Sequence, residues 1–245
     1  MKKLAFLGVS LLILASCKQN TTQTIEYKHQ IDTLASGYLK GYLTDTLNIS
    51  AVLNAPPSLG SDLFSIDSIE TMKFYQSDES RKQQAVADAK LSFESFEEIS
   101  GMQLSMETTP HAYILMQRVI GDVISYSGQA KKEFKRLRPY ETLGIESCWP
   151  EKEHKGSYSY PSGHAMIGFT WAALFSSIYS EQGQELMARG EAYANSRVVC
   201  GVHWYYDVVA SKSLSSTLIS NLLKNEEFQH DLDAAQLEIE RLKIR

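Results

Sequence analysis

Residues 161–179 read PSGHAMIGFTWAALFSSIY, in which turn-forming and polar residues precede a long apolar run. Ser162 is one of the residue types that cap helix N-termini, and the run after it has the length of a globular helix. We therefore expect a helix from Ser162 to about Tyr179. Helix-forming patterns continue on both sides of this stretch.

Downstream, further helices are expected at about 181–199, from near Val202, and over 226–243. The last of these has apolar residues at alternating spacings of four and three, which is typical of an amphipathic helix. The stripe consists of Phe228, Leu232, Ala235, Ile239 and Leu242. Such a stripe usually packs on its own domain, and a dimer contact is the alternative.

Upstream, helices are expected over about 67–76, 80–96 and 110–124. Asp67 with Glu70 suits a capping box at the start of the first. The second is rich in Ala, Lys, Gln and Glu, which are good helix formers. In the third, Pro110 follows Thr109 and suits a first helical position.

Clustered Pro and Gly residues predict loops at 54–61 and 139–161, and long ordered loops often carry function. Strand-like alternation is scarce, nothing repeats at a fixed period, and no internal linker divides the chain. A length of 245 residues suits one domain of ordinary core size. The predicted fold is an all-α, single-domain helical bundle.

The N-terminus has the layout of an export signal. Lys2 and Lys3 precede an apolar run at 4–15 that is too short to span a membrane. Leu14-Ala15-Ser16-Cys17 resembles the bacterial lipoprotein lipobox, in which the cysteine is acylated. We expect an exported lipoprotein, anchored to a membrane and facing the periplasm; ordinary signal cleavage with an incidental cysteine is the alternative. The expected divisions are a signal peptide at 1–16, a tether and N-terminal segment at 17–49, and a catalytic domain at 50–245.

Two further cysteines follow, Cys148 and Cys200. An exported compartment permits a disulfide and two cysteines allow one pairing, although two buried free thiols are the alternative. The net charge of −5 argues against general binding to nucleic acid polymers, and a local cluster of cations therefore suggests a specific purpose.

The first candidate stretch for chemistry runs from Lys131 to Pro139. Lys131 and Arg138 are seven residues apart, almost two helical turns, so both cations can lie on one helix face. The alternative is a solvated basic face, because this stretch also holds Lys132, Lys135 and Arg136.

The second stretch is the start of the helix at Ser162. Gly163 lets a backbone approach a ligand closely, and a helix start presents unpaired N–H groups to an anion. Ser162 adds a hydroxyl donor, and His164 holds a transferable proton near neutral pH. A plain N-cap with a surface histidine is the alternative.

The third stretch holds Arg197, His203 and Asp207. At a spacing of four, His203 and Asp207 share a helix face, where the carboxylate can fix the tautomer of the ring. Gly201 is expected to break the helix, so that Arg197 and His203 can point into one pocket. A buried histidine satisfied by a local aspartate is the alternative.

Together the stretches supply three cations (Lys131, Arg138, Arg197) and two neutral donors (Ser162, Gly163) beside an acid and an oriented histidine. Transfer of a phosphoryl group requires preorganised donors of this kind, because charge spreads over three equatorial oxygens. A metal is not expected, because acidic ligands are missing from the constellation and the cysteines are not closely spaced. We expect no cofactor.

These three stretches resemble the three-part signature of the type 2 phosphatidic acid phosphatase superfamily, which also holds the vanadium haloperoxidases. The likeness is closer to the class A bacterial non-specific acid phosphatases, because residues 84–89 and 196–204 resemble the sequences of that family. It covers roughly residues 50–243 and implies an all-helical bundle without metal. The implied activity is hydrolysis of small phosphate monoesters, with broad specificity, through a phosphohistidine.

The resemblance also implies a role for each motif residue. His203 is the nucleophile, Asp207 orients it, and His164 is the acid for the leaving group. The phosphate is held by Lys131, Arg138, Ser162, Gly163 and Arg197. Because class A relatives are often homo-oligomers, a homodimer is expected.

Three rival functions remain. A membrane-associated lipid phosphate phosphatase of the same superfamily is the main alternative, since a lipid anchor could bring the domain to a bilayer. A vanadium-dependent haloperoxidase would use the same anion pocket for vanadate. A phosphate-binding lipoprotein without catalysis is the third.

Overall fold

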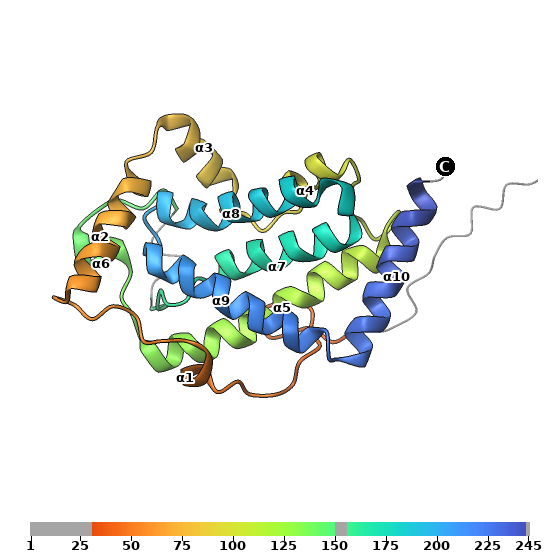
Figure 1. Ribbon diagram of the computed structural model, residues 1–245, viewed down its shortest axis with the longest axis horizontal. Coiled ribbons are helices and arrows are strands. Elements are labelled where there is room, and N and C mark those ends of the chain that lie inside the picture. Colours follow the sequence, from red (N-terminus) through yellow and green to blue (C-terminus); the bar gives the residue numbers. More distant parts are fainter. Residues whose placement is uncertain (1–30, 150–155, 244–245) are drawn as a thin grey trace, which may run out of the picture.

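The computed structural model describes residues 31–149 and 156–243. Over these ranges the chain forms helices and loops without a strand, and an isolated β-bridge pairs Thr33 with Leu39. The elements are α1 (Ile49–Val52), α2 (Asp62–Tyr75), α3 (Glu79–Ala87), α4 (Glu94–Ser100), α5 (Pro110–Phe134), α6 (Pro139–Leu143), α7 (Gly163–Ile178), η2 (Ser180–Gln182), α8 (Gly183–Val199), α9 (Tyr205–Leu222) and α10 (Glu226–Lys243). The predicted all-α fold is confirmed (Figure 1).

Helix α7 is the central helix of the bundle. It is apolar on almost every side from Ala165 to Phe175, and such a helix has to be covered by neighbours. Helices α5, α8 and α9 pack around it (Figure 1). Gly190 lets α8 approach closely, because a Cβ at that position would lie 2.3 Å from the Cβ of Ala172.

Four helix ends meet at one end of this bundle. Helices α7 and α8 are joined by the short turn η2 and run in opposite directions, so α7 begins where α8 ends. Helix α9 begins and α5 ends at the same side of the molecule (Figure 1). The three candidate stretches of the sequence lie at or beside these ends.

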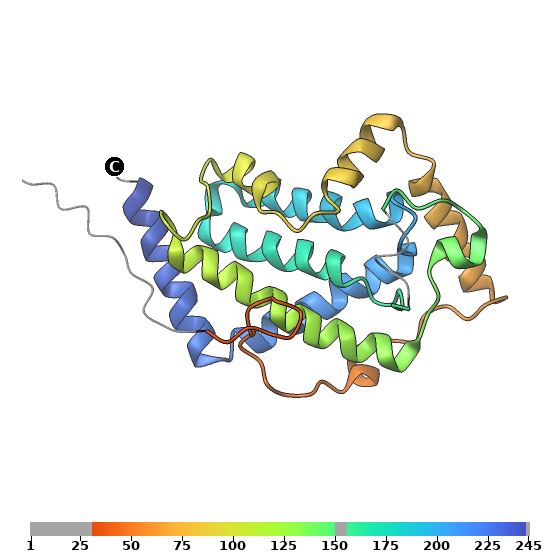
Figure 2. The same ribbon diagram turned by 180° about the vertical axis from the view of Figure 1, so that it is seen from behind.

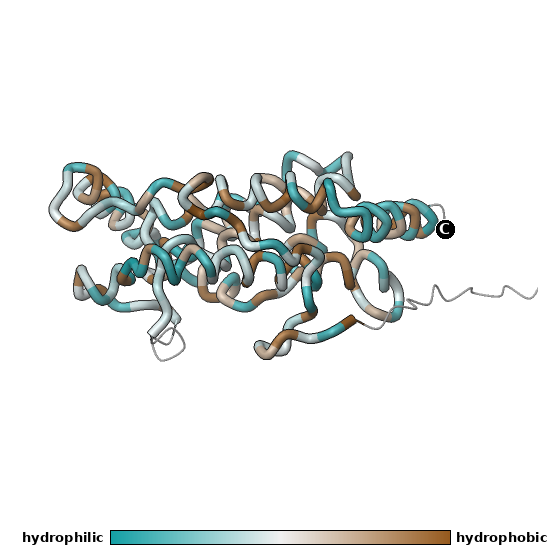
Figure 3. The backbone as a smooth tube through the Cα atoms, turned by 90° about the horizontal axis from the view of Figure 1, so that it is seen from below, coloured by the Kyte–Doolittle hydropathy of each residue, from teal (hydrophilic) through white to brown (hydrophobic). Residues whose placement is uncertain are grey.

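Helix α10 confirms the amphipathic pattern of the tail. Phe228, Ala235 and Ile239 are buried in the main core, and Leu232 and Leu242 pack against it. Apolar and polar residues alternate along this helix (Figure 3), which packs mainly against α5. The stripe therefore serves its own domain.

Several expected boundaries were wrong. Helix α2 begins five residues before Asp67, after Ser61, whose side chain accepts a hydrogen bond from the Phe64 N–H (3.1 Å). The helix expected over 80–96 is divided into α3 and α4 by a break at 88–93. Residues 139–161 contain the short helix α6, although part of that segment lies outside the described ranges.

The segment before α1 packs on the bundle and runs across α5 (Figure 2). The Asp122 carboxylate on α5 accepts hydrogen bonds from the backbone N–H groups of Tyr42 (3.1 Å) and Leu43 (2.8 Å). Packing therefore begins before residue 50, where the sequence placed the start of the catalytic domain.

The predicted signal peptide at 1–16 and the lipidated Cys17 lie outside the described residues. None of the described helices is long and apolar enough to cross a membrane.

Candidate active site

A cavity of about 590 Å³ opens where the helix ends meet. All of the predicted site residues line it except Ser162 and Asp207, which are buried behind it. The lining residues are Tyr38, Ala89, Lys90, Leu91, Lys131, Arg138, Trp149, Ser157, Gly163, His164, Arg197 and His203. The fold thus brings the three sequence stretches together around one cavity.

His203 has the hydrogen-bonding pattern of an oriented nucleophile. Its Nδ1 lies 3.2 Å from Oδ2 of Asp207, and its Nε2 lies 3.2 Å from Nη1 of Arg138. An ionised carboxylate only accepts and a guanidinium only donates, so the proton belongs on Nδ1 and the lone pair on Nε2. Nε2 is therefore the nucleophilic atom of this ring.

The expectation that His203 and Asp207 share a helix face was wrong, although the contact itself forms. His203 lies in the turn between α8 and α9, in which Gly201 has a φ of +71°. Asp207 lies in the first turn of α9 and accepts a hydrogen bond from the Trp204 N–H (2.9 Å). The carboxylate thereby binds the start of the helix and the ring just before it.

Arg136 and Asp67 are site residues that the sequence analysis missed. Arg136, which entered the sequence analysis only as part of the alternative solvated basic face, is buried and donates from Nη1 to Oδ1 of Asp207 (2.8 Å). Its Nη2 forms an ion pair with Asp67, which is itself fully buried. Burial raises the pKa of Asp207, and Arg136 is the strongest influence opposing that rise. No local sequence pattern predicts the pairing of Arg136 with Asp207 or with Asp67, because the partners are about seventy residues apart.

The three cations that were predicted to bind phosphate come from three elements. Lys131 lies on α5 and donates from Nζ to the Tyr158 carbonyl (2.7 Å). The predicted shared helix face was wrong, since α5 ends at Phe134 and Arg138 caps α6 instead. Arg138 donates to the Val202 carbonyl (2.7 Å), which fixes its guanidinium beside His203.

Arg197 is the strongest sign of an anion site. It is buried near the end of α8, yet its Nε and Nη1 have no hydrogen-bond partner within the described part of the chain. Burial, together with the neighbouring Arg138, lowers its pKa to about 10, despite opposing effects of Tyr193 and Asp88. Burial and Arg138 likewise lower the pKa of Lys131 to about 7. Buried donors rarely stay unpaired, so this cluster is suited to an anion.

Ser162 and Gly163 form the start of α7 at the cavity. The Ser162 hydroxyl oxygen accepts from the Ala165 N–H (3.2 Å), and a hydroxyl can donate its own proton at the same time. At Gly163 a Cβ would lie 3.0 Å from Oγ of Ser127 on α5, so the absence of a side chain lets the start of α7 pack closely on α5. Gly163 thus lines the cavity, whereas Ser162 is fully buried next to it.

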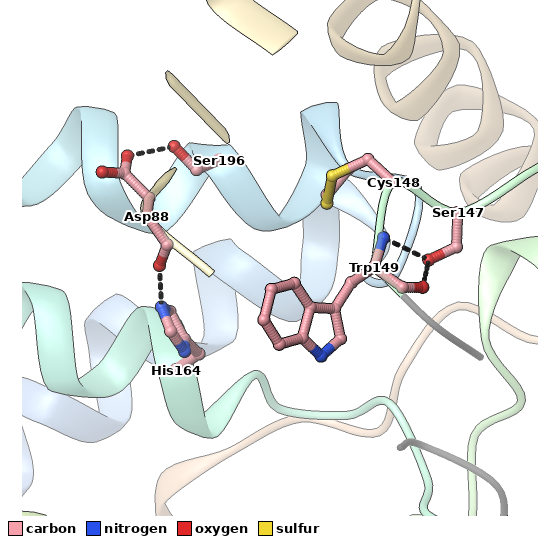
Figure 4. Close-up of a disulfide and its surroundings, with 7 residues drawn as sticks. Asp88, Ser147, Cys148, Trp149, His164 and Ser196 are labelled. Carbon is pink, nitrogen blue, oxygen red and sulfur yellow. Dashed lines mark hydrogen bonds between the residues drawn. A yellow bond between two sulfur atoms is a disulfide. The ribbon is translucent and has the colours of Figure 1, made fainter. Parts of the chain in front are cut away.

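His164 follows directly, and its ring is held on two sides. It stacks on Tyr193, with ring centroids 4.9 Å apart and planes at 10°. Its Nε2 donates to the Asp88 carbonyl (2.6 Å), because a carbonyl oxygen only accepts (Figure 4). The Asp88 side chain in turn accepts from Ser196 and pairs with Arg189. The break between α3 and α4 places Asp88 here, which the predicted continuous helix did not foresee.

Cys148 and Cys200 are joined as a disulfide in the structure, with Cα atoms 4.8 Å apart (Figure 4). The Cys148 N–H also donates to the Cys200 carbonyl (3.0 Å). The link ties the segment after α6 to the turn that carries His203. Among the described residues, no group of three or more His, Cys, Asp or Glu side chains is placed to hold a metal ion.

Comparisons with known proteins identify the family of this chain. Residues 111–225 match the model of the PAP2 superfamily. The non-specific acid phosphatase of Providencia stuartii is 34% identical over 217 residues, covering 84% of this chain and 86% of that protein. The non-specific acid phosphatase of Salmonella typhi is 30% identical, covering 80% of this chain and 81% of that protein. Among solved structures, the first transmembrane PAP2 type phosphatidylglycerolphosphate phosphatase, from Bacillus subtilis, has a TM-score of 0.49 and 18% identity, covering 69% of this chain and 89% of that chain.

This chain belongs to the PAP2 superfamily and, within it, to the family of the bacterial non-specific acid phosphatases.

Proposed function

We propose that this phosphoric monoester hydrolase is an acid phosphatase that cleaves small phosphate monoesters without a metal, through a phosphohistidine on His203. The observation that carries the proposal is the buried Arg197, which lines the same cavity as Lys131, Arg138 and His203. Residues 31–149 and 156–243 supply no hydrogen-bond partner for its Nε and Nη1. Three cations can balance the negative charge on a phosphoryl group in the transition state of its transfer. Family membership supports the same reaction class.

In the first step, Nε2 of His203 bonds to phosphorus while the bond from phosphorus to the leaving oxygen breaks. That oxygen takes a proton from Nδ1 of His164, whose ring enters the step doubly protonated and keeps the Nε2–H that donates to the Asp88 carbonyl. In the second step His164 takes a proton from water, and the water oxygen bonds to phosphorus. The phosphorus–nitrogen bond breaks, releasing inorganic phosphate and restoring both rings.

During both steps the remaining residues hold charge and orientation. Asp207 keeps the proton on Nδ1 of His203 and stabilises the ring when it carries the phosphoryl group. The Ser162 hydroxyl and the Gly163 backbone add neutral donors at the start of α7. The cavity volume of about 590 Å³ leaves room beyond the phosphate, which supports broad specificity.

Rapid acid quench with radiolabelled substrate tests the two histidine roles. We expect His203→Ala to form no phosphoenzyme, whereas His164→Ala still forms it from an activated ester whose leaving group needs little protonation. A phosphohistidine in His203→Ala, with none in His164→Ala, would reverse the roles.

Chelators should leave the activity intact, and loss of activity restored by a divalent ion would contradict the metal-free reaction.

We also propose that the protein is an exported lipoprotein, anchored through acylated Cys17 and facing the periplasm, and that it forms a homodimer. The first part is supported by the lipobox-like residues 14–17 and the second by the family resemblance. Labelling cells with a fatty acid should mark the wild type and not Cys17→Ala. Sedimentation of the protein after removal of the anchor should give the mass of two chains.

A substrate panel that includes phosphatidate separates the proposed acid phosphatase activity from that of a lipid phosphate phosphatase.

A further inference from the structure

The cavity has a second chemical character besides its cations and histidines. Three of its lining residues, Tyr38, Leu91 and Trp149, are rich in carbon and half-buried. The proposed reaction assigns them no role, since neither the phosphate nor the proton transfers need them. A volume of about 590 Å³ is in the range of sites that enclose an organic ligand. These residues therefore line space that the alcohol part of a substrate can fill.

The backbone of Trp149 is held by its neighbours in sequence. Its N–H donates to Oγ of Ser147 (3.1 Å), and that hydroxyl donates to the Trp149 carbonyl (2.5 Å). The preceding Cys148 is bonded to Cys200 through its side chain and its backbone N–H. Trp149 and His164 line the same cavity, and Figure 4 shows the indole, the disulfide and the His164 ring in one region of the site. An aromatic side chain thus shares the cavity with the residue that is proposed to protonate the leaving oxygen.

We propose that Trp149 determines specificity by stacking on the leaving group, so that the favoured monoesters carry a planar aromatic ring. Indole faces bind planar rings of many kinds through offset stacking, which tolerates aryl groups and nucleobases alike. Aliphatic alcohols gain only general apolar contact from the same surface. The inference rests on the proposed phosphatase function and names the substrate class within it.

Calorimetric titration with phenylphosphonate and methylphosphonate tests the proposal without any turnover. Both carry the same anionic group, and only the first carries a ring. We expect Trp149→Ala to weaken phenylphosphonate about 2- to 10-fold and to leave methylphosphonate unchanged. Trp149→Phe should recover much of the loss because it keeps a ring, and Trp149→Leu should not. Melting temperatures of the variants verify that they fold.

Turnover of phenyl phosphate and glycerol 2-phosphate provides the second arm. We expect KM for phenyl phosphate to rise in Trp149→Ala by the same factor, with glycerol 2-phosphate unaffected. Equal losses for both phosphonates, no loss for either, or rescue by Trp149→Leu as complete as by Trp149→Phe would overturn the proposal. Wild type that binds phenylphosphonate selectively but hydrolyses neither ester would refute the proposed function and leave the stacking site standing.

Discussion

Replacing Arg136 by Met removes the buried cation between two buried carboxylates. Arg136 donates to Asp207 and pairs with Asp67, and both carboxylates are fully buried. The guanidinium also lies over the Trp204 ring, 4.9 Å from its centroid. Methionine keeps most of the apolar volume and loses the charge. The negative charges of Asp67 and Asp207 are then no longer balanced by a cation. As a result, Asp207 is no longer kept ionised beside His203.

Breaking a buried pair by removing one partner costs about 3–5 kcal/mol, since the remaining charge is left in a poor solvent. In a domain of this size each kcal/mol corresponds to about 2–4 °C of Tm, so we expect Arg136→Met to melt roughly 6–20 °C lower. Turnover should fall on the order of 10²–10⁴-fold, because a protonated Asp207 no longer fixes the tautomer of His203.

The effect of pH has opposite signs for stability and turnover. Burial raises the pKa of Asp207 already, and without Arg136 this pKa rises further. A carboxyl with a raised folded-state pKa favours the fold while protonated, so this stability is lost as pH rises above the unfolded value near 3.9. The Tm gap between variant and wild type should therefore widen with pH. Relative turnover should recover over the same range, because catalysis needs the ionised form.

Calorimetry and steady-state kinetics at several pH values measure both trends. The matched control is Lys132→Met, an identical change of charge at an exposed position of α5. It should leave Tm and turnover nearly unchanged. Wild-type Tm and turnover in Arg136→Met, or a Tm gap that is independent of pH, would refute the reasoning that Arg136 sets the charge of Asp207.

Three further predictions concern other parts of the site. Lys131 is charged below its pKa of about 7 and neutral above it, so sulfate, whose own charge is constant, should inhibit less strongly as pH rises through 7. Lys131→Arg should flatten that dependence, and an equally steep dependence in both proteins would contradict the assignment. Asp88→Ala should loosen the carbonyl that holds His164, lowering turnover of esters with poor leaving groups more than that of activated esters. A uniform loss across leaving groups would assign Asp88 a structural role only. Oxidised protein should show a linked Cys148–Cys200 peptide by mass spectrometry, and reduction should cost about 3–4 kcal/mol of stability; two free thiols would exclude the bond.

The sequence by itself determined the parts of this protein that depend on local pattern. Ser162 before an apolar run predicted the start of α7, and Pro110 predicted the start of α5. The spacing of apolar residues predicted α10 and the face that it buries. Capping, proline geometry and helical periodicity act within a few residues, so one stretch of sequence contains all the information that they need. The same motifs also named six of the twelve residues that line the cavity.

Only the tertiary structure decided which distant groups complete those motifs. Arg136 appeared to be one of several surface cations, and Asp67 appeared to be a helix cap. Their burial with Asp207 depends on how α2 and the end of α5 meet α9. The Asp88 carbonyl reaches His164 because α3 stops early, although its residues favour a longer helix. Burial and long-range pairing are properties of the packed bundle, because desolvation and Coulomb energy depend on distance in space and not along the chain.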